Sequence, residues 1–343
     1  MSPRIKRSRL VRSLVVLVPL LLVVALVAWR GPEIGPVERA FRYVRWEWVA
    51  AAVLLNLFSV VVRSEAWRTV IKQAIPPPAP AHRTVFSAFC VGLLGNAALP
   101  GRVGELARVA VITRHLRRRP GTWATIAGTV FSHRLFDFVV AVPLVVYVLY
   151  AAKLPDWAVP GLAVVSGVGL GLLLAAFLLA RRELKPVHES LSLTRRLLRM
   201  ARAGLAVLRR PGPAVEALVF QVLGWTAQLF AVYTTFLAFN IDASITAAAL
   251  VLVMMNVAMA FPFWPGNVGL VQAAVALALL PYGINYGRGV LFGIGLQAIE
   301  VSVGIGLGLF FLAREGFSFA MLRRMPEVTE APMEEDERVE RIA

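Results

Sequence analysis

Long apolar stretches dominate this chain, and several approach or exceed the roughly 20 residues that a membrane-spanning helix needs. Hydrophobic residues make up 58% of the 343 residues. A soluble domain has a smaller apolar share. The sequence therefore predicts an all-α polytopic membrane protein.

Six of these stretches have the length and apolarity of spanning helices. They are residues 14–29, 46–63, 123–150, 157–180, 214–239 and 289–313. Two further apolar regions, 84–114 and 245–282, are each interrupted by a Pro-Gly step. We therefore expect about six spanning helices and two regions of a different kind.

The two interrupted regions carry related motifs, LPGRVGEL at 99–106 and WPGNVGLV at 264–271. Proline removes a backbone donor and keeps the preceding residue out of the helical conformation, while glycine permits a turn. We therefore expect each region to form a re-entrant hairpin, with one kinked span as the alternative. The residues assigned to these turns are Asn96, Pro100, Gly101, Gly104, Pro262, Pro265, Gly266 and Gly269.

Lysine and arginine are unevenly distributed between the connecting segments. With both interrupted regions treated as hairpins, the segments assigned to the cytoplasm contain 25 basic residues and the external ones contain six. Cytoplasmic loops of membrane proteins carry such an excess. We expect a multi-pass protein of the plasma membrane with both termini cytoplasmic. Segment 30–45, with four arginines, is the external segment that departs from this rule.

The order of the predicted segments repeats along the chain. A helix, a hairpin and a helix over residues 46–150 are followed by the same arrangement over residues 214–313. The first unit begins outside and the second inside, so the two units form a predicted inverted repeat. In transporters this architecture puts the substrate between broken helices at the membrane midplane.

Three further segments flank or join the repeats in the predicted membrane domain, residues 14–324. The basic N-terminus 1–13 precedes a run that we interpret as a retained signal anchor, with a cleaved signal peptide as the alternative. The linker 181–212 has nine basic and two acidic residues, and its spacing of leucines favours an amphipathic helix on the inner leaflet. The tail 325–343 is acidic and predicted to be disordered.

Charged residues inside the apolar regions are the candidates for function, because each costs at least about 2.5–3.5 kcal/mol to insert. The predicted headgroup-binding residues are Arg102, Glu105, Arg108, Arg134, Asp137 and Glu300. The first three share one face of the half-helix that follows the first Pro-Gly step. The free N–H groups of a helix start, with an arginine beside them, suit an anion such as phosphate. The alternative is a buried charge network that only locks the helices together.

Other kinds of site find little support. The single cysteine, Cys90, excludes a disulfide framework, and the four histidines lack a metal-ligand spacing, so we expect no metal and no cofactor. Arginines in loops explain the net charge of +16, so we expect no nucleic-acid partner. Asn96, Asn256 and Gln272 are expected to cap the broken helices rather than to bind a ligand.

Three motifs carry a resemblance to a known family: NAALPGRVGELAR at 96–108, HRLFD at 133–137 and PFWPGNVG at 262–269. They resemble the flippase-like membrane family typified by the transmembrane region of lysylphosphatidylglycerol synthase, over about residues 10–315. The resemblance implies movement of lipids or lipid-linked sugars between leaflets. It also implies that the polar residues of the first two motifs match characteristic family positions. Gln272 and Gln297 depart from the family pattern, in which an acid and an arginine are common.

The leading interpretation is a lipid translocator whose partners are membrane lipids with an anionic headgroup. One alternative is a membrane enzyme, or its accessory subunit, that acts on lipid-linked intermediates. A small-solute or ion-coupled transporter is a further alternative, because it shares the inverted repeat. The sequence holds no DxD or HEXXH motif and no soluble aminoacyl-transferring domain. We therefore do not expect the synthase reaction itself.

Overall fold

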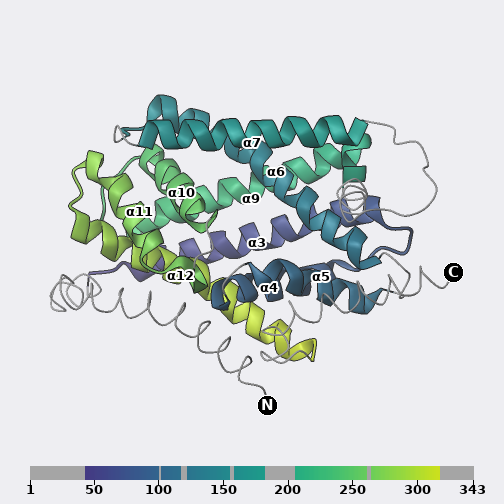
Figure 1. Ribbon diagram of the computed structural model, residues 1–343. Coiled ribbons are helices and arrows are strands. Elements are labelled where there is room, and N and C mark those ends of the chain that lie inside the picture. Colours follow the sequence, from purple (N-terminus) through teal and green to yellow (C-terminus); the bar gives the residue numbers. More distant parts are fainter. Residues whose placement is uncertain are drawn as a thin grey trace, which may run out of the picture.

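The computed structural model describes residues 43–99, 102–116, 122–154, 158–181, 205–260 and 264–316. These parts contain nine α-helices, three short 3-10 helices and no strand (Figure 1). The α-helices are α3 (Trp46–Ala74), α4 (His82–Ala98), α5 (Val103–His115), α6 (Thr122–Ala151), α7 (Ala158–Arg181), α9 (Pro211–Ala238), α10 (Ile245–Ala260), α11 (Leu270–Leu279) and α12 (Tyr286–Arg314). The 3-10 helices are η1 (Leu205–Arg209), η2 (Pro265–Asn267) and η3 (Leu280–Tyr282). The prediction of an all-helical protein is confirmed for the described residues.

Five segments of the described chain are long and apolar enough to cross a membrane. They are Trp46–Ala74, Thr125–Ala151, Pro211–Ala238, Pro265–Tyr282 and Tyr286–Arg314. Four of them correspond to predicted spans, and the fifth lies in the second interrupted region. Helix α7 matches the predicted span 157–180 in position. The predicted span 14–29, the amphipathic part of the linker and the acidic tail lie outside the described residues.

Helix α3 is longer than the sequence predicted. The predicted span ends at residue 63, whereas the helix continues to Ala74. The charged residues beyond this point do not end the helix, because each arginine has an acidic partner. Arg63 pairs with Asp137 of α6, and Arg68 pairs with Glu65, three residues earlier on α3. The predicted end of this helix at residue 63 is therefore wrong. The helix instead carries that arginine into the interior of the protein.

The first Pro-Gly step separates two helices that fold back on each other. Leu99, the residue before Pro100, is extended with φ −123° and ψ 145°, as expected before a proline. Arg102 then has a left-handed conformation (φ 56°) and is the N-cap of α5. The two helices touch through their backbones, since a Cβ on Gly104 would lie 1.9 Å from the carbonyl oxygen of Gly92. Glycine at position 104 is therefore required by this contact.

A left-handed non-glycine residue also follows the second Pro-Gly step. Gly266 and Asn267 are left-handed, with φ of 64° and 47°, between α10 and α11. Asn267 lies 165 positions after Arg102, which is the spacing of the two sequence motifs. Both non-glycine residues accept a conformation that costs about 1–2 kcal/mol for most side chains. The two turns are therefore built alike at their most strained position.

The helices pack around a central pair, α3 and α9, which lie side by side (Figure 1). Helix α4 packs against α5 and α12, while α10 packs against α11, α9 and α6. Buried apolar side chains form two main clusters, one around Trp67 and Ile112 and one around Phe236 and Leu250. Each cluster surrounds one of the interrupted regions, so polar groups between the clusters are kept at the centre of the bundle.

Candidate functional site

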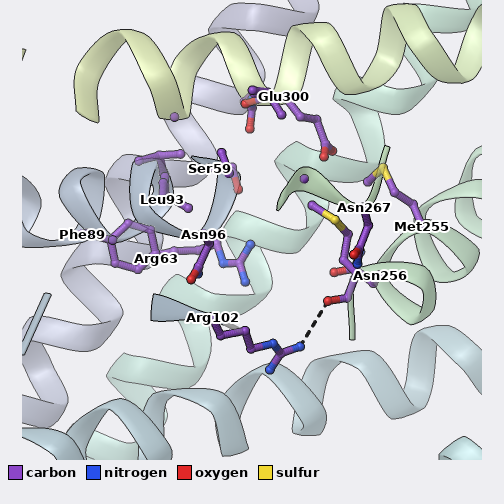
Figure 2. Close-up of a pocket in the computed structure, with 18 of the residues that line it drawn as sticks. Ser59, Arg63, Phe89, Leu93, Asn96, Arg102, Met255, Asn256, Asn267 and Glu300 are labelled. Atoms are coloured by element: carbon purple, nitrogen blue, oxygen red, sulfur yellow. Dashed lines mark hydrogen bonds between the residues drawn. The ribbon is translucent and has the colours of Figure 1, made fainter. Parts of the chain in front are cut away.

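A cavity of about 260 Å³ lies at this centre, between the two turns (Figure 2). The middle of α3 contributes Asn56, Ser59 and Arg63, and the middle of α12 contributes Glu300. Helix α4, the end of α10 and both turns complete the wall. Apolar side chains, among them Leu93 and Met255, alternate with the polar ones. The cavity therefore offers a small polar chamber at mid-depth of the long helices.

Arginine dominates the charge of the cavity wall. Four arginines line it, and Glu300 is the acidic residue that lines it, which gives four positive charges, one negative charge and a net charge of +3 for this wall. The arginines are Arg63, Arg102, Arg108 and Arg134. Glu105 and Asp137 contact three of these arginines from behind the wall. With these two carboxylates included, the four arginines and three acids have a net charge of +1.

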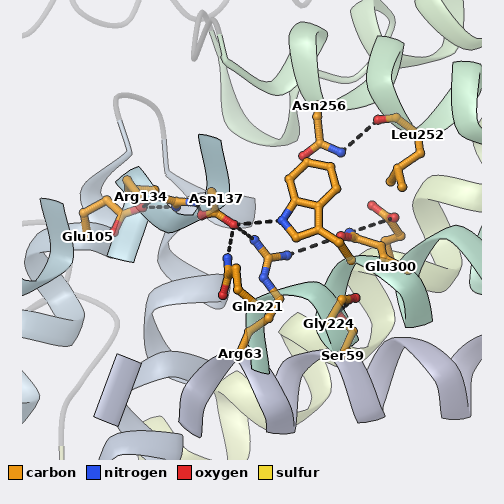
Figure 3. Close-up of polar contacts among 12 residues, drawn as sticks. Ser59, Arg63, Glu105, Arg134, Asp137, Gln221, Gly224, Leu252, Asn256 and Glu300 are labelled. Atoms are coloured by element: carbon orange, nitrogen blue, oxygen red, sulfur yellow. Dashed lines mark hydrogen bonds and ion pairs between the residues drawn. The ribbon is translucent and has the colours of Figure 1, made fainter. Parts of the chain in front are cut away.

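Glu105 of α5 connects two of the arginines, Arg108 and Arg134, and its contact with Arg134 is drawn in Figure 3. Its Oε2 accepts from Arg108, one turn along the same helix, through Nε at 2.8 Å and also through Nη2. Its Oε1 accepts from Arg134 of α6, through Nε at 3.1 Å and also through Nη2. This carboxylate thus ties the first hairpin to α6 with charge-assisted hydrogen bonds.

Asp137 collects four donors from three helices (Figure 3). Arg134 reaches its Oδ2 at 3.2 Å, and Arg63 reaches its Oδ1 at 2.6 Å. Gln221 also donates to Oδ1, and the indole N–H of Trp225 does so at 3.2 Å. The order Arg108–Glu105–Arg134–Asp137–Arg63 therefore alternates in charge along its whole length. With three arginines and two acids, this network has a net charge of +1.

The members of the network differ in exposure. The side chains of Arg108 and Asp137 are 5% and 12% exposed, whereas Arg134 is 36% exposed toward the cavity. Removing one partner of a buried pair typically costs 3–5 kcal/mol, because the other charge is left uncompensated. The inner members therefore stabilise the fold, and Arg134 in addition presents N–H groups to the cavity.

Arg102 is held differently from the other arginines. It makes no ion pair with a described residue, and its Nη2 lies 3.4 Å from the carbonyl oxygen of Met259 and 3.3 Å from that of Ala260 (Figure 2). These carbonyl oxygens belong to the last turn of α10, where no N–H group of the same helix is available to donate to them. Arg102 is exposed to the cavity. Its positive charge is thus available to a ligand at the point where the two turns meet.

Glu300 faces the cavity from the middle of α12. Its Oε1 accepts from Gln228 of α9 at 3.4 Å, and the Oε1 of Gln228 accepts from Arg63 at 3.3 Å (Figure 3). Its backbone carbonyl accepts from Asn56 of α3 at 3.2 Å. Gln228 therefore stands between this carboxylate and the nearest member of the charge network.

The model of one protein family, described as the lysylphosphatidylglycerol synthase TM region, matches residues 10–308. The chain belongs to this family. The match covers the two turns, the charge network and the cavity. No curated protein and no solved structure matches the chain.

In this member of the lysylphosphatidylglycerol synthase TM region family, the second turn is held by neutral side chains. Gln272, at the third position of α11, accepts from the backbone N–H of Gly269 and donates to Gln297 of α12. Gln297 in turn donates to the carbonyl oxygen of Gly266. This neutral pair connects α11 to α12, whereas the ion pair of Glu105 and Arg134 connects α5 to α6. Gln272 caps a broken helix, as the sequence predicted.

The remaining predicted residues are distributed as follows. Asn96 lines the cavity, and its Oδ1 is buried beside Gly104, where a Cβ would lie 2.6 Å away. Asn256 donates to Leu252 one turn back on α10 and also lines the cavity. Gly269 has a φ of 92° at the start of α11. Pro100, Gly101 and Pro262 lie outside the described residues.

Sequence reasoning missed the contribution of the central helix pair of this family member. Asn56, Ser59 and Arg63 lie on α3 at i, i+3 and i+7, a spacing that puts three polar side chains on one helix face. Ser59 donates to the carbonyl oxygen of Gly224 at 2.8 Å, and a Cβ on that glycine would lie 2.4 Å from Cγ of Arg63. The helical spacing was the available signal. The predicted end of the span at residue 63 concealed it.

The described residues hold no group of three or more His, Cys, Asp or Glu side chains that could bind a metal ion. Arginine, amide and carboxyl groups line the cavity, and guanidinium and amide N–H groups are suited to hydrogen-bond an anion.

Proposed function

We propose that this protein moves an anionic lipid, or a lipid-linked intermediate, between the leaflets of the plasma membrane. The observation that carries the proposal is a set of four arginines on the wall of a cavity at mid-depth of the bundle, one of which, Arg102, makes no ion pair with a described residue. Charges at this depth are expensive and mark substrate paths in membrane proteins. A phosphate in the cavity would offset the positive charge of Arg102 and accept hydrogen bonds from its guanidinium N–H groups.

Arg102 is the first candidate to bind the headgroup. A guanidinium group offers a rigid fork of N–H donors that matches two oxygens of a phosphate. Its present contacts are to two neutral carbonyl oxygens at 3.3 and 3.4 Å. A charged phosphate oxygen is a stronger acceptor than a carbonyl oxygen. An entering anion would therefore displace these contacts rather than an ion pair.

Arg134 is the second candidate, because it is the most exposed member of the charge network. Its guanidinium is already oriented by Glu105 and Asp137. Such preorganisation lowers the entropy lost when a ligand binds. The acyl or prenyl tails would stay in the bilayer beside the bundle while the headgroup crosses through the cavity.

The proposal includes two re-entrant hairpins of opposite orientation, with both termini in the cytoplasm. Helices α4 and α10 have 17 and 16 residues, or about 24–26 Å at 1.5 Å per residue. A bilayer core is about 30 Å thick. The matching left-handed residues at the two turns, 165 positions apart, further support an inverted repeat.

A liposome assay with the purified protein tests the proposal. Fluorescent phosphatidylglycerol is expected to move between leaflets faster than fluorescent phosphatidylcholine, as measured by the fraction that an external reductant cannot quench. Arg102→Gln should reduce this exchange at least about tenfold, the effect of losing about 1.4 kcal/mol of charge-assisted binding. Arg102→Lys should lose less, because it keeps the charge without the fork.

The matched control is Arg288→Gln. Arg288 is exposed, also donates to a backbone carbonyl oxygen, that of Asn240 at 2.8 Å, and does not line the cavity. It should transport as the wild type does. Full transport by a well-folded Arg102→Gln variant would remove the headgroup role of Arg102. Equal rates for the two lipids in the wild type would remove the anion selectivity.

A further inference from the structure

Three carboxylates lie in or beside the cavity, and one of them has different surroundings. Glu105 and Asp137 each contact two arginine side chains. Glu300 makes no ion pair with a described residue, and its carboxylate accepts a single hydrogen bond, from the neutral amide of Gln228 at 3.4 Å. The carboxylate that faces the cavity is thus the one without a cation.

Each element around Glu300 contributes neutral groups or a cation that is committed elsewhere. Helix α3 presents Asn56, which donates to the backbone carbonyl of Glu300, and Arg63, which pairs with Asp137. Helix α9 presents Gln228, and α4 presents Leu93 beside the next turn of α12. On α12 itself, Gln297 is bonded to Gln272 of α11 and to the second turn.

The other charged groups on the cavity wall do not pair with Glu300 either. They are Arg102, which contacts the end of α10, and Arg108 and Arg134, which contact Glu105. An ionised carboxylate in a buried site costs several kcal/mol unless a cation or a proton neutralises it. Within membrane domains, acidic side chains in such places form proton paths.

We propose that Glu300 is a proton-binding site, and that proton binding there is coupled to anion binding at Arg102 and Arg134. The anion part rests on the function proposed above. Glu300 and the two arginines line one cavity of about 260 Å³. An anion in that space repels an ionised Glu300, and this repulsion is stronger than in bulk water because the protein interior has a lower effective dielectric constant.

The coupling has a fixed sign. Neutral Glu300 favours the anion, and by thermodynamic reciprocity the bound anion favours the proton. A proton therefore enters the cavity together with the headgroup and leaves with it. The step breaks no covalent bond other than the O–H bond of the carboxyl group. A proton gradient across the membrane would consequently bias the direction in which the lipid moves.

A binding experiment with the purified full chain tests the coupling. The probe is short-chain phosphatidylglycerol, whose phosphodiester keeps its charge in both acidic and alkaline buffer. The wild type should bind it about tenfold more tightly in acidic buffer, an effect within the usual range of coupled sites. Glu300→Gln imitates the protonated side chain, so it should bind equally tightly at both pH values, as the wild type does in acid.

The matched control is Glu216→Gln. Glu216 is exposed near the start of α9, where it accepts from Thr69 at 3.1 Å. This variant should keep the pH response of the wild type. A wild-type affinity that does not change with pH would overturn the coupling. The same pH response in Glu300→Gln as in the wild type would overturn the role of Glu300.

A second measurement without lipid separates this proposal from the proposed function. Infrared difference spectra between mildly acidic and alkaline buffer, in both of which exposed Asp and Glu stay ionised, should show the carbonyl band of a protonated buried carboxyl group. That band should be lost in Glu300→Gln and kept in Glu216→Gln. Binding of the lipid with an unchanged band in Glu300→Gln would refute the proton site alone. A band lost in Glu300→Gln with no lipid binding in any variant would support the proton site and refute the lipid substrate.

Discussion

The two Pro-Gly turns each have a left-handed residue at corresponding sequence positions, Arg102 and Asn267, but differ in how they are held. At the first turn, Glu105 and Arg134 form an ion pair that continues to Asp137 and Arg63. At the second, Gln272 and Gln297 connect α11 to α12 without any charge. The same mechanical connection can thus be made by ionised or by neutral side chains. Because the neutral version suffices for the turn, the charges of the first turn require another explanation.

The charged residues at the first turn also contribute to the cavity wall. The two amides at the second turn satisfy each other and the turn backbone, whereas Arg134 keeps part of its guanidinium exposed to the cavity. Neutral amide pairs are also less costly to bury than ions. Under the proposed function, this asymmetry provides one side that binds the anion and one side that supports the structure.

The largest expected effect is the all-or-none accessibility of the flanks of the two turns. Single cysteines at Arg83 and His115 flank the first hairpin, and cysteines at Asp242 and Tyr286 flank the second. In an inverted repeat, the first two should react with an impermeant maleimide from the cytoplasmic side and the last two from the other side. The native Cys90 is buried and should stay unlabelled. Labelling of Arg83 and His115 from opposite sides would show that the first region spans the membrane.

The next largest effect concerns stability at the two turns. Glu105→Ala should lower the free energy of unfolding by about 3–5 kcal/mol, because Arg108 and Arg134 lose their shared partner. Gln272→Ala should cost only about 1–2 kcal/mol, because it removes neutral hydrogen bonds. Thermal unfolding in detergent measures both. Equal losses would mean that the ion pairs add nothing to the turn.

A smaller loss is expected from the backbone contact in the first hairpin. Gly104→Ala would bring a Cβ within 1.9 Å of the carbonyl oxygen of Gly92, so α4 and α5 must separate. Overpacking of this kind costs about 1–3 kcal/mol. Gly161→Ala is the control, since nothing lies within 4 Å of its added Cβ. A Gly104→Ala variant as stable as the control would show that the two helices do not pack this closely.

The smallest effect is expected when the second turn is given the charges of the first. The double variant Gln272→Glu with Gln297→Arg should change stability by less than about 1.5 kcal/mol, because a well-formed buried pair roughly offsets its own desolvation. Gln272→Glu alone should cost more, since the new carboxylate has no cation. A double variant less stable than the single one would show that the second turn excludes charge.

Much of the architecture could be predicted because it depends on local sequence. Apolar length predicted α6, α9 and α12 to within three residues at each end. The Pro-Gly steps predicted the breaks after Ala98 and Ala260, since proline and glycine act on their own backbone. The end of α3 was missed because Arg63 reads as a loop residue until its partner is known.

The candidate site was only partly predictable for the same reason. The sequence identified Arg102, Glu105 and Arg134 as costly charges, and all three lie at or directly behind the cavity wall. The contributions of Ser59 and Gln228 were not predicted, because a single polar residue in an apolar helix resembles many others. Their role depends on the packing of α3 along α9, which no local pattern encodes.

The sequence by itself determined that the chain is helical, that it belongs in a membrane, and that two of its apolar regions are broken by Pro-Gly. These properties follow from the transfer energy and backbone freedom of individual residues. Only the tertiary structure decided which charges are paired. Asp137 forms an ion pair with Arg63, which lies 74 positions earlier in the sequence. Glu300 faces the cavity, and its carboxylate accepts a hydrogen bond from the neutral amide of Gln228. Pairing depends on which side-chain ends the packed helices bring within a few ångströms, and that distance is set by the whole bundle.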